Sequence, residues 1–285
     1  MQGVGVFVLY CALPALVIRA LTQQPLDEVF KLNYLVAYGL GSIAVFGAGL
    51  LLCLKLQRQP LNASAMQALG MAAANSGFVG YPVAAMVIGS PAAVLLALNM
   101  LVENLLVLPA ALILAEMGNH QGASVWKTVK QTALSLIKNP VLVGLLIGIC
   151  LAVSGIKIPA PLFKAIDMLA EAAGPAALFV IGGALFGLQV KGMASDVGQI
   201  VIGKLIVHPL VILIAFTFIP GIDPLYMAGA LLFAAAPMIS IYPLFGQRYG
   251  LGGVSAASML VATIASFFTL SLIIGLMSLS GLLAF

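Results

Sequence analysis

The fold of this chain is decided by Ala72-Ala-Ala-Asn-Ser-Gly-Phe-Val-Gly-Tyr-Pro82 and by Ala234-Ala-Ala-Pro-Met-Ile-Ser-Ile-Tyr-Pro243, two apolar segments that each end in Tyr-Pro. Proline lacks a backbone donor and clashes with the preceding helical turn. We therefore expect Pro82, together with Gly77 and Gly80, to unwind the first segment near the middle of a helix. In lipid such a break persists only inside protein or beside a wet cavity. A single break could be a kink that only aids packing, whereas paired breaks predict a binding site.

Composition predicts an integral membrane protein. Of the 285 residues, 63% are hydrophobic and 7% are charged, and the mean hydropathy is +1.20. A soluble domain carries roughly 25% charged residues, so most of this surface has to face lipid. The net charge of +4 is spread over several loops instead of one basic stripe, which argues against a nucleic-acid-binding protein.

Nine segments are apolar and long enough to be membrane helices, which need about 20 residues each. Sustained strand alternation is not seen in the sequence, so we expect an all-α integral membrane protein, with residues 1–285 forming a single membrane unit. The expected spans are 3–22, 33–56, 65–89, 91–115, 139–156, 168–189, 197–219, 224–247 and 252–280.

Basic residues between the spans predict the orientation in the membrane. One side carries Lys55, Arg58, Lys127, Lys130, Lys138, Lys191 and Arg248, whereas the other carries Arg19, Lys31, Lys157 and Lys164 with Asp27, Glu28 and Asp223. The more basic side is usually cytoplasmic. We therefore expect a multi-pass protein of the plasma (inner) membrane, with loop 116–138 in the cytoplasm and the C-terminus outside.

The chain contains an internal repeat. Pro82 and Pro243 are 161 residues apart (243 − 82), and so are Pro14 and Pro175. At this offset the first four spans pair with the last four, and the members of each pair cross the membrane in opposite directions. Inverted repeats with paired broken helices are typical of secondary transporters, with the site near the midplane. The fifth span, 139–156, has no partner, so we expect ten spans with the first lost from this sequence; the alternative is a protein of nine spans.

Several pieces of the sequence resemble the auxin efflux carrier family, which includes plant auxin exporters and bacterial carriers of malonate and other organic acids. Besides the central loop, they are Tyr10-Cys-Ala-Leu-Pro-Ala-Leu16, Ala74-Asn-Ser-Gly-Phe-Val-Gly-Tyr-Pro82, and Ala236-Pro-Met-Ile-Ser-Ile-Tyr-Pro243 before Arg248-Tyr-Gly250. The resemblance covers nearly the whole chain. Its most specific piece is the string that runs from Asn75 to Pro82.

The resemblance implies ten spans in two inverted five-helix repeats, whose two broken helices cross at the substrate site. Carried over to this chain, the crossing helices would be 65–89 and 224–247. The scaffold, which would also form a homodimer interface, would consist of 3–22, 139–156, 168–189 and the absent helix. The moving transport domain would consist of 33–56, 65–89, 91–115, 197–219, 224–247 and 252–280.

The breaks predict where a substrate binds. Half-helix N-termini present the positive end of a dipole to anions, so a carboxylate could bind there without a dedicated arginine. The expected binding residues are Asn75, Ser76, Gly77, Gly80, Tyr81, Pro82, Pro237, Ser240, Tyr242 and Pro243. For Ser76 and Ser240, an alternative is that the hydroxyl only satisfies the local backbone.

Polar residues inside other spans are candidates for ion coupling or charge pairing, namely Glu103, Asn104, Lys204 and His208. A charge at a helix centre costs about 2.5–3.5 kcal/mol on insertion scales, so it usually faces a cavity or a partner. Glu103 could couple transport to protons, because burial favours a neutral carboxyl, or it could lock helices together. Lys204 could neutralise a substrate carboxylate, pair with Glu103 or snorkel. His208 could relay protons or pack at the kink before Pro209.

Small residues predict close helix packing in the scaffold. The patterns Gly144-xxx-Gly148 and Gly183-xxx-Gly187 could let helices approach within one chain or between protomers.

The function expected from these features is a carrier that moves a small organic anion, such as a dicarboxylate or an auxin-like carboxylate, by alternating access. H⁺ or the membrane potential would drive it. The alternatives are a Na⁺-coupled bile-acid-type symporter and, from another class, a channel or structural membrane subunit. An enzyme is not expected, because the sequence has only His120 and His208 and no zinc-protease motif. Cys11, Cys53 and Cys150 lack metal-ligand spacing, so we expect no metal or cofactor beyond a coupling H⁺ or Na⁺.

Overall fold

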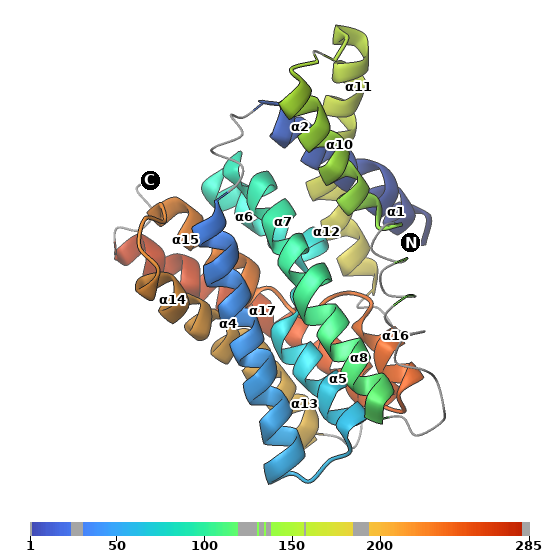
Figure 1. The fold of residues 1–285 in the computed structure, drawn as a ribbon, viewed down its shortest axis with the longest axis vertical. Coiled ribbons are helices and arrows are strands. Elements are labelled where there is room, and N and C mark those ends of the chain that lie inside the picture. The colour runs from blue at the N-terminus through green and yellow to red at the C-terminus, as the bar shows by residue number, and fades with distance from the viewer. Residues whose placement is uncertain are drawn as a thin grey trace.

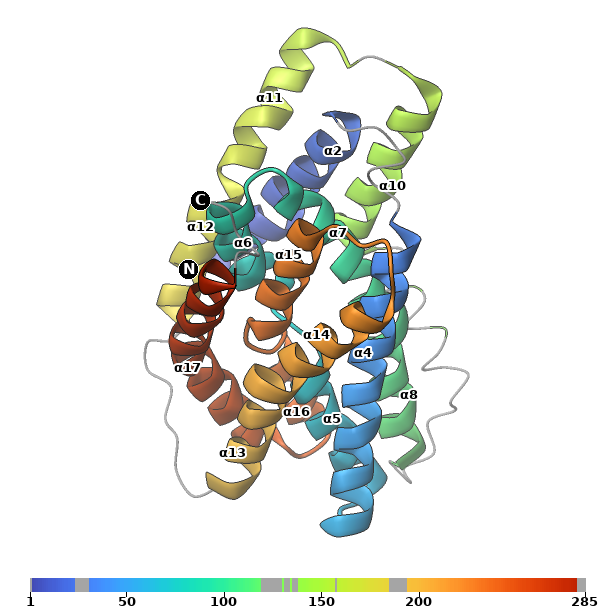
Figure 2. The same cartoon turned by 90° about the vertical axis from the view of Figure 1, so that its left-hand side faces the viewer.

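A computed structural model of the protein shows a bundle of helices (Figures 1 and 2), and it describes residues 2–23, 31–118, 130, 134, 138–156, 158–184 and 194–280. The described residues are helical except for short connections and one isolated β-bridge between Ala74 and Met238. The expected all-α architecture is therefore confirmed for this part of the chain.

Several helices are long and apolar enough to cross a membrane. Within the described ranges they are Gly3–Gln23, Leu32–Leu56, Pro91–Gly118, Ala194–Phe218 and Gly252–Leu279. Shorter apolar helices are Ser76–Ile88, Pro140–Ser154 and Pro224–Ala235. The five long helices coincide with expected spans, while the total of nine spans stays a prediction.

The elements follow one another along the chain as α helices, with short π-helical stretches of wider turns labelled η. They are α1 (Gln2–Phe7), η1 (Val8–Ala12), α2 (Leu13–Gln23), α4 (Leu32–Leu51), η2 (Leu52–Leu56), α5 (Leu61–Ala72), η3 (Ser76–Gly80), α6 (Tyr81–Ile88), α7 (Pro91–Val102), η4 (Glu103–Val107), α8 (Leu108–Gly118), α10 (Pro140–Ser154), α11 (Ala160–Glu171), α12 (Ala173–Ala184), α13 (Ala194–Ile202), η5 (Gly203–Val207), α14 (His208–Phe218), α15 (Pro224–Ala235), α16 (Tyr242–Arg248) and α17 (Gly252–Leu279).

Two helices extend beyond the boundaries that the sequence suggests. The helical residues around the expected span 168–189 begin earlier, because α11 already starts at Ala160 with a proline in its first turn, while the span itself stays a prediction. Lys164, Asp167 and Glu171 share one face of α11 and lower its hydropathy, so the expected span left out most of this helix. Within the expected loop 116–138, α8 extends to Gly118, and most of the remainder lies outside the described residues, as do 185–189.

Prolines explain most of the wide helical turns. Pro14, Pro82, Pro109 and Pro209 each lie two residues beyond the end of a π-helical stretch, namely η1, η3, η4 and η5. A proline ring clashes with the carbonyl group four residues earlier, and in each case that carbonyl lies inside the wide turn. Widened turns of this kind occur frequently at functional sites. Three of these stretches, η3, η4 and η5, carry polar residues that the sequence analysis names as site candidates.

One group of helices packs around α2. Helix α2 contacts α10 and α11, and α12 contacts α1, η1 and α6 (Figure 1). A Cβ atom on Gly144 would lie 2.9 Å from the Pro14 Cα atom, and one on Gly148 would lie 2.7 Å from Leu21 Cδ1. The expected role of Gly144 and Gly148 in close packing is thus confirmed within the chain, whereas Gly187 lies outside the described residues.

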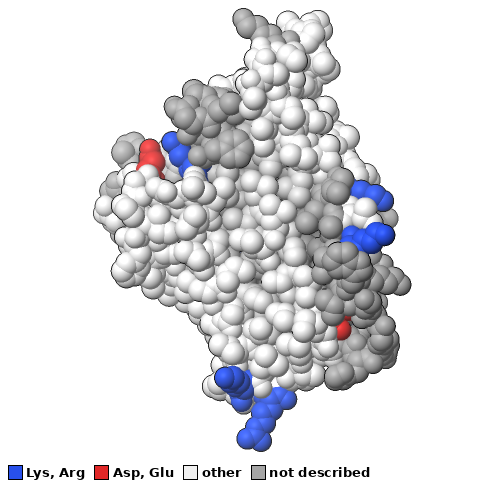
Figure 3. Space-filling view, viewed as in Figure 1, with Lys and Arg blue, Asp and Glu red and all other residues white. Residues whose placement is uncertain are grey.

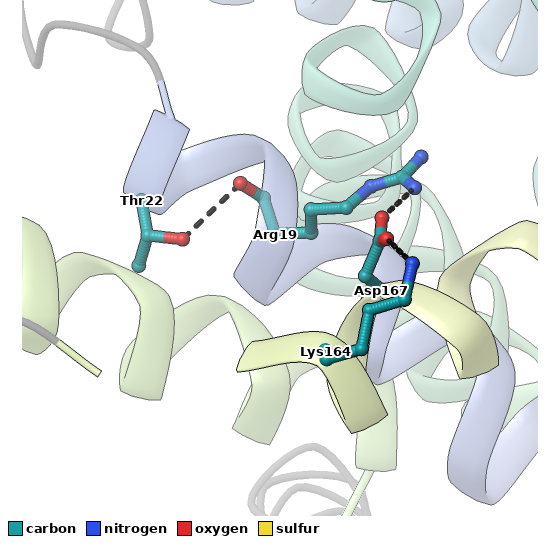
Figure 4. A network of polar contacts seen from close by, with 4 residues as sticks. All are labelled: Arg19, Thr22, Lys164 and Asp167. Atoms are coloured by element: carbon teal, nitrogen blue, oxygen red, sulfur yellow. Dashed lines mark hydrogen bonds and ion pairs between the residues drawn. The ribbon is translucent and has the colours of Figure 1, made fainter. Parts of the chain in front are cut away.

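An ion pair also joins α2 to α11 (Figure 4). Arg19 Nη1 donates to Asp167 Oδ1 at 2.8 Å, and Lys164 Nζ donates to Asp167 Oδ2 at 3.2 Å. The Arg19 guanidinium, followed by Lys164, holds the pKa of Asp167 below its usual value. The carboxylate therefore stays charged at neutral pH, and the link holds the end of α11 against α2.

The surface is suited to lipid. Large apolar side chains are exposed on several helices, including Leu40, Ile214 and Phe268 with exposed fractions of 61%, 53% and 76%. Figure 3 shows few charged side chains on the visible face, with a broad uncharged stretch between them. This distribution fits the expectation, from composition, of a surface that faces lipid.

The close contact between α10 and α2 gives a stability prediction. We expect Gly144→Ala to destabilise the protein by about 1–3 kcal/mol, because the new methyl group overpacks a contact with backbone atoms that cannot move aside. Gly47→Ala, in α4 with nothing within 4 Å of the new atom, is the matched control. It should be neutral or stabilising, since alanine favours helix over glycine by roughly 0.5–1 kcal/mol. Melting temperatures in detergent measure both, and equal values for the two variants would contradict the packing argument.

Candidate functional site

The structure confirms two interrupted helices. Helix α5 ends at Ala72, and the chain becomes helical again at Ser76. Helix α15 ends at Ala235, and α16 begins at Tyr242. The expected interruptions are thus present in both segments that end in Tyr-Pro.

The first break lies earlier than expected. Gly77 and Gly80 lie within η3, and Pro82 occupies the first turn of α6, where proline is favoured. The non-helical residues are 73–75, so Asn75 lies inside the break instead of ahead of it. The glycines serve close packing, because a Cβ on Gly80 would lie 2.6 Å from the Phe233 ring and one on Gly77 would lie 2.9 Å from Leu13.

The two breaks cross and pair through their backbones. The Asn75 N–H donates to the Pro237 carbonyl at 2.7 Å, beside the antiparallel bridge between Ala74 and Met238. An unpaired backbone group is costly where water is excluded. Each interruption therefore supplies partners for groups that the other has freed, which explains why the breaks meet.

A buried charged residue contacts each break. Glu103 Oε1 accepts hydrogen bonds from the Ala74 N–H at 3.1 Å and from Ser76 Oγ at 2.8 Å. Lys204 Nζ donates to the Ala234 carbonyl at 2.6 Å, at the end of α15. Glu103 is 3% exposed and Lys204 is fully buried. A carboxylate thus faces a freed donor at one break, and an ammonium faces a freed acceptor at the other.

Lys204 and His208 form a buried pair, as their spacing predicts. Lys204 Nζ lies 2.7 Å from His208 Nδ1, and His208 Nε2 lies 3.1 Å from Ser42 Oγ. The snorkelling alternative for Lys204 is wrong, because its side chain is enclosed by these contacts and by the Ala234 carbonyl. The direct contacts described for Lys204 do not include Glu103.

A cavity of about 570 Å³ opens beside the crossing. Its lining includes the expected residues Asn75, Ser76, Gly77, Ser240, Glu103 and Asn104, together with apolar side chains of η1, α7 and α8. The expected residues Gly80, Tyr81, Pro82, Pro237, Tyr242, Pro243, Lys204 and His208 are not on the lining that the structure describes. Pro237 takes part in the crossing through its carbonyl group, and Tyr242 lies against Gly70.

Two buried donors in this cavity have no hydrogen-bond partner among the described residues. Asn75 Oδ1 accepts from the Phe78 N–H at 3.2 Å, which leaves Asn75 Nδ2 unpaired. Ser240 Oγ is also buried and unpaired. A buried polar group without a partner costs about 1–3 kcal/mol. Two such donors on one cavity are suited to an acceptor such as a carboxylate.

Sequence reasoning missed another part of the lining. Tyr10, Phe78, Asn139, Arg248 and Tyr249 all face the cavity. Four of them, Tyr10, Phe78, Arg248 and Tyr249, occur in the strings that carry the family resemblance, so the sequence did contain a signal for them. Asn139 is the N-cap of α10 and accepts from the Val141 N–H, so its local role concealed its position on the cavity.

Comparison with known proteins places the chain in a family. The family described as "Membrane transport protein" matches residues 1–274. A protein of Rhizobium meliloti (strain 1021) named "Putative malonate transporter" is similar, with 29% identity over 274 residues that cover 95% of this chain and 85% of that protein. The resemblance noted from the sequence is confirmed. The chain belongs to the membrane transport protein family, the auxin efflux carrier family, and is accordingly a multi-pass membrane transporter and not an enzyme.

Proposed function

We propose that the protein is a secondary carrier of a small organic anion, with the crossing of the two breaks as its substrate site. The observation that carries this proposal is the pair of buried, unpaired donors, Asn75 Nδ2 and Ser240 Oγ, on one cavity. Ser76 begins the half-helix that continues to Ile88, and its N-terminal dipole favours an anion at the same place. No dedicated cation is needed at the crossing for this binding mode.

A dicarboxylate is the substrate class that we favour. The similar Rhizobium protein is named for malonate, and a cavity of about 570 Å³ has room for a small anion of that kind with water. The auxin-like carboxylate is the alternative within the same family.

Alternating access is supported by what lies on each side of the cavity. Leu9, Tyr10 and Leu13, from the helices around α2, form one wall, and the crossing forms another. We propose that the spans 3–22, 139–156 and 168–189 stay fixed, and also form a dimer interface, while the crossing helices move relative to them. The inverted five-helix repeat is the symmetry that would make the two access states equivalent.

The donors at the crossing give the first transport prediction. Ser240→Ala should raise KM for malonate about tenfold or more, because a hydrogen bond to a charged group contributes about 1.5–3 kcal/mol. Asn75→Asp should abolish anion transport, since it keeps the acceptor for Phe78 N–H and adds a repelling charge. Ser258→Ala is the matched control, because Ser258 Oγ is buried and unpaired but lies outside the cavity lining. Uptake of labelled malonate into proteoliposomes measures all three, and unchanged uptake by Asn75→Asp would disprove the site.

Glu103 is the coupling group in this proposal. It lies on the cavity lining and contacts the first break through the Ala74 N–H and Ser76 Oγ. Protonation of this carboxyl would alter both contacts. The conformation of the first break would therefore depend on whether Glu103 is protonated. Lys204 contacts the second break through the Ala234 carbonyl, and His208 in turn contacts Lys204.

The coupling prediction uses a substitution that preserves shape. Glu103→Gln keeps an oxygen that accepts from Ala74 N–H and Ser76 Oγ but cannot gain or lose charge. We expect it to lose accumulation of malonate driven by a pH gradient while malonate exchange at equal concentrations continues. Gradient-driven uptake and counterflow in the same proteoliposomes separate these activities. Accumulation that persists in Glu103→Gln would contradict proton coupling through this residue.

The same assay tests the two alternative hypotheses, a Na⁺-coupled symporter and a channel. A Na⁺-coupled symporter of the bile-acid type would require sodium for uptake, with Asn75 and Glu103 among its ligands. A channel would show flux that does not saturate with malonate and no counterflow. Saturable, sodium-independent counterflow supports the carrier proposed here.

A further inference from the structure

The cavity reaches the surface at an end that carries positive charge. The charged residues on its described lining are Glu103 at the crossing, and Lys138 and Arg248 away from it. Lys138 is exposed, and the Arg248 side chain has an exposed fraction of 54%. We call the part of the lining formed by Lys138, Asn139, Arg248 and Tyr249 the mouth. Its basic character is distinct from the uncharged donors at the crossing.

Arg248 is held at the mouth by a residue of another helix. Arg248 Nη2 donates to Glu116 Oε2 at 3.3 Å, and the Tyr249 hydroxyl donates to the same oxygen at 3.1 Å. Burial raises the pKa of Tyr249 to about 12, so this hydroxyl stays a donor at neutral pH. The Arg248 guanidinium also lies 5.4 Å from the Tyr249 ring centroid. These contacts join the end of α8 to the end of α16.

The helix that carries Glu116 does not stabilise the negative charge of this residue. It lies in the last turn of α8, where the helix dipole disfavours a negative charge. Its side chain is 3% exposed, so the carboxylate depends on Arg248 and Tyr249. A guanidinium has five N–H donors, and a single contact with Glu116 leaves most of them able to bind another carboxylate.

Lys138 and the helix that follows it add to the positive potential at the mouth. Lys138 precedes α10, a helix of 15 residues whose N-terminus begins at the mouth with Asn139 as its cap. The positive end of this helix dipole and the Lys138 ammonium therefore act together with Arg248. A low-dielectric cleft lined by charge of one sign concentrates ions of the other sign and increases their rate of association.

We propose that Arg248 and Lys138 form a capture site for small carboxylates at the mouth, separate from the crossing, and that Glu116 is a positioning residue which competes with the substrate for Arg248. An incoming carboxylate binds the guanidinium in two-point geometry. Glu116 then recovers its contact as the anion moves inward, which prevents Arg248 from retaining it. This inference rests on the proposed function, because it requires that the cavity carry a carboxylate.

The test compares variants that should shift KM in opposite directions. KM and kcat for malonate are measured from each face, in right-side-out and inside-out vesicles. Arg248→Gln should raise KM at least fivefold at one face only, with kcat nearly unchanged. Glu116→Gln should lower KM at that same face, because Arg248 loses its competitor. Arg58→Gln, an exposed arginine outside the cavity lining, is the control and should change neither constant.

Salt gives a second readout that a purely structural ion pair would not produce. Raising the ionic strength from about 0.01 to about 0.15 M shortens the Debye length from about 30 to about 8 Å. KM of the wild-type protein at the mouth face should rise over this range. In the double variant Arg248→Gln with Lys138→Gln, KM should be nearly independent of salt.

The possible results separate the two proposals. KM changes of opposite sign, confined to one face, support the capture site. If Glu116→Gln raises KM as Arg248→Gln does, or if both faces respond equally, the capture site is wrong while the carrier proposal stands. If the wild-type protein moves no dicarboxylate or auxin-like carboxylate, both proposals fail. Arg248→Lys guards against misfolding of Arg248→Gln, because it keeps the charge and should show a smaller shift at the same face.

Discussion

The hydrogen bond from the Asn75 N–H to the Pro237 carbonyl is the constraint on which the rest of the structure depends. A helix that breaks inside a membrane exposes donors and acceptors that lipid cannot satisfy. Here a freed donor of one break meets a freed acceptor of the other, while the Ala74 N–H meets Glu103 and the Ala234 carbonyl meets Lys204. Neither break can provide hydrogen-bond partners for all of its own backbone groups, so the two interrupted helices have to cross. The cavity is a consequence of that crossing, because helices that end in mid-bundle leave space beyond their ends.

The prolines shape the site mainly by widening the helical turns that precede them, and less by creating the breaks. Pro109 and Pro209 follow wide turns that carry Glu103 and Lys204, and Pro82 follows the wide turn that carries Ser76. At the start of one such turn, Asn104 Nδ2 donates to the Met100 carbonyl at 2.8 Å. A proline five or six residues beyond a polar side chain thus places that side chain on an irregular turn inside the bundle. This links the sequence pattern to the position of the buried charges.

Hydropathy and proline spacing predicted the membrane helices and both breaks, because burial in lipid and loss of a backbone donor act locally along the chain. They misplaced the first break: Pro82 suggested it, but the interruption lies at residues 73–75. The position depends on where Glu103 can reach a freed N–H, which is a tertiary contact. The sequence singled out Asn75 and Ser240, which both line the cavity, but for the same reason it did not predict the contact of Glu116 with Arg248. These partners are 132 residues apart, and no local pattern connects them.

Some polar groups at the crossing have hydrogen-bond partners and others do not, and this difference affects how a substrate could bind and leave. Glu103 and Lys204 each have close partners, and they hold the breaks in shape. Asn75 Nδ2 and Ser240 Oγ have none among the described residues. If these donors bonded to the protein, a substrate would have to displace a partner before binding. If a fixed cation stood beside them, a carboxylate would bind too tightly to leave. In the carrier that we propose, two neutral donors would bind an anion with moderate strength, and the Arg248 cation lies at the mouth, where it contacts Glu116.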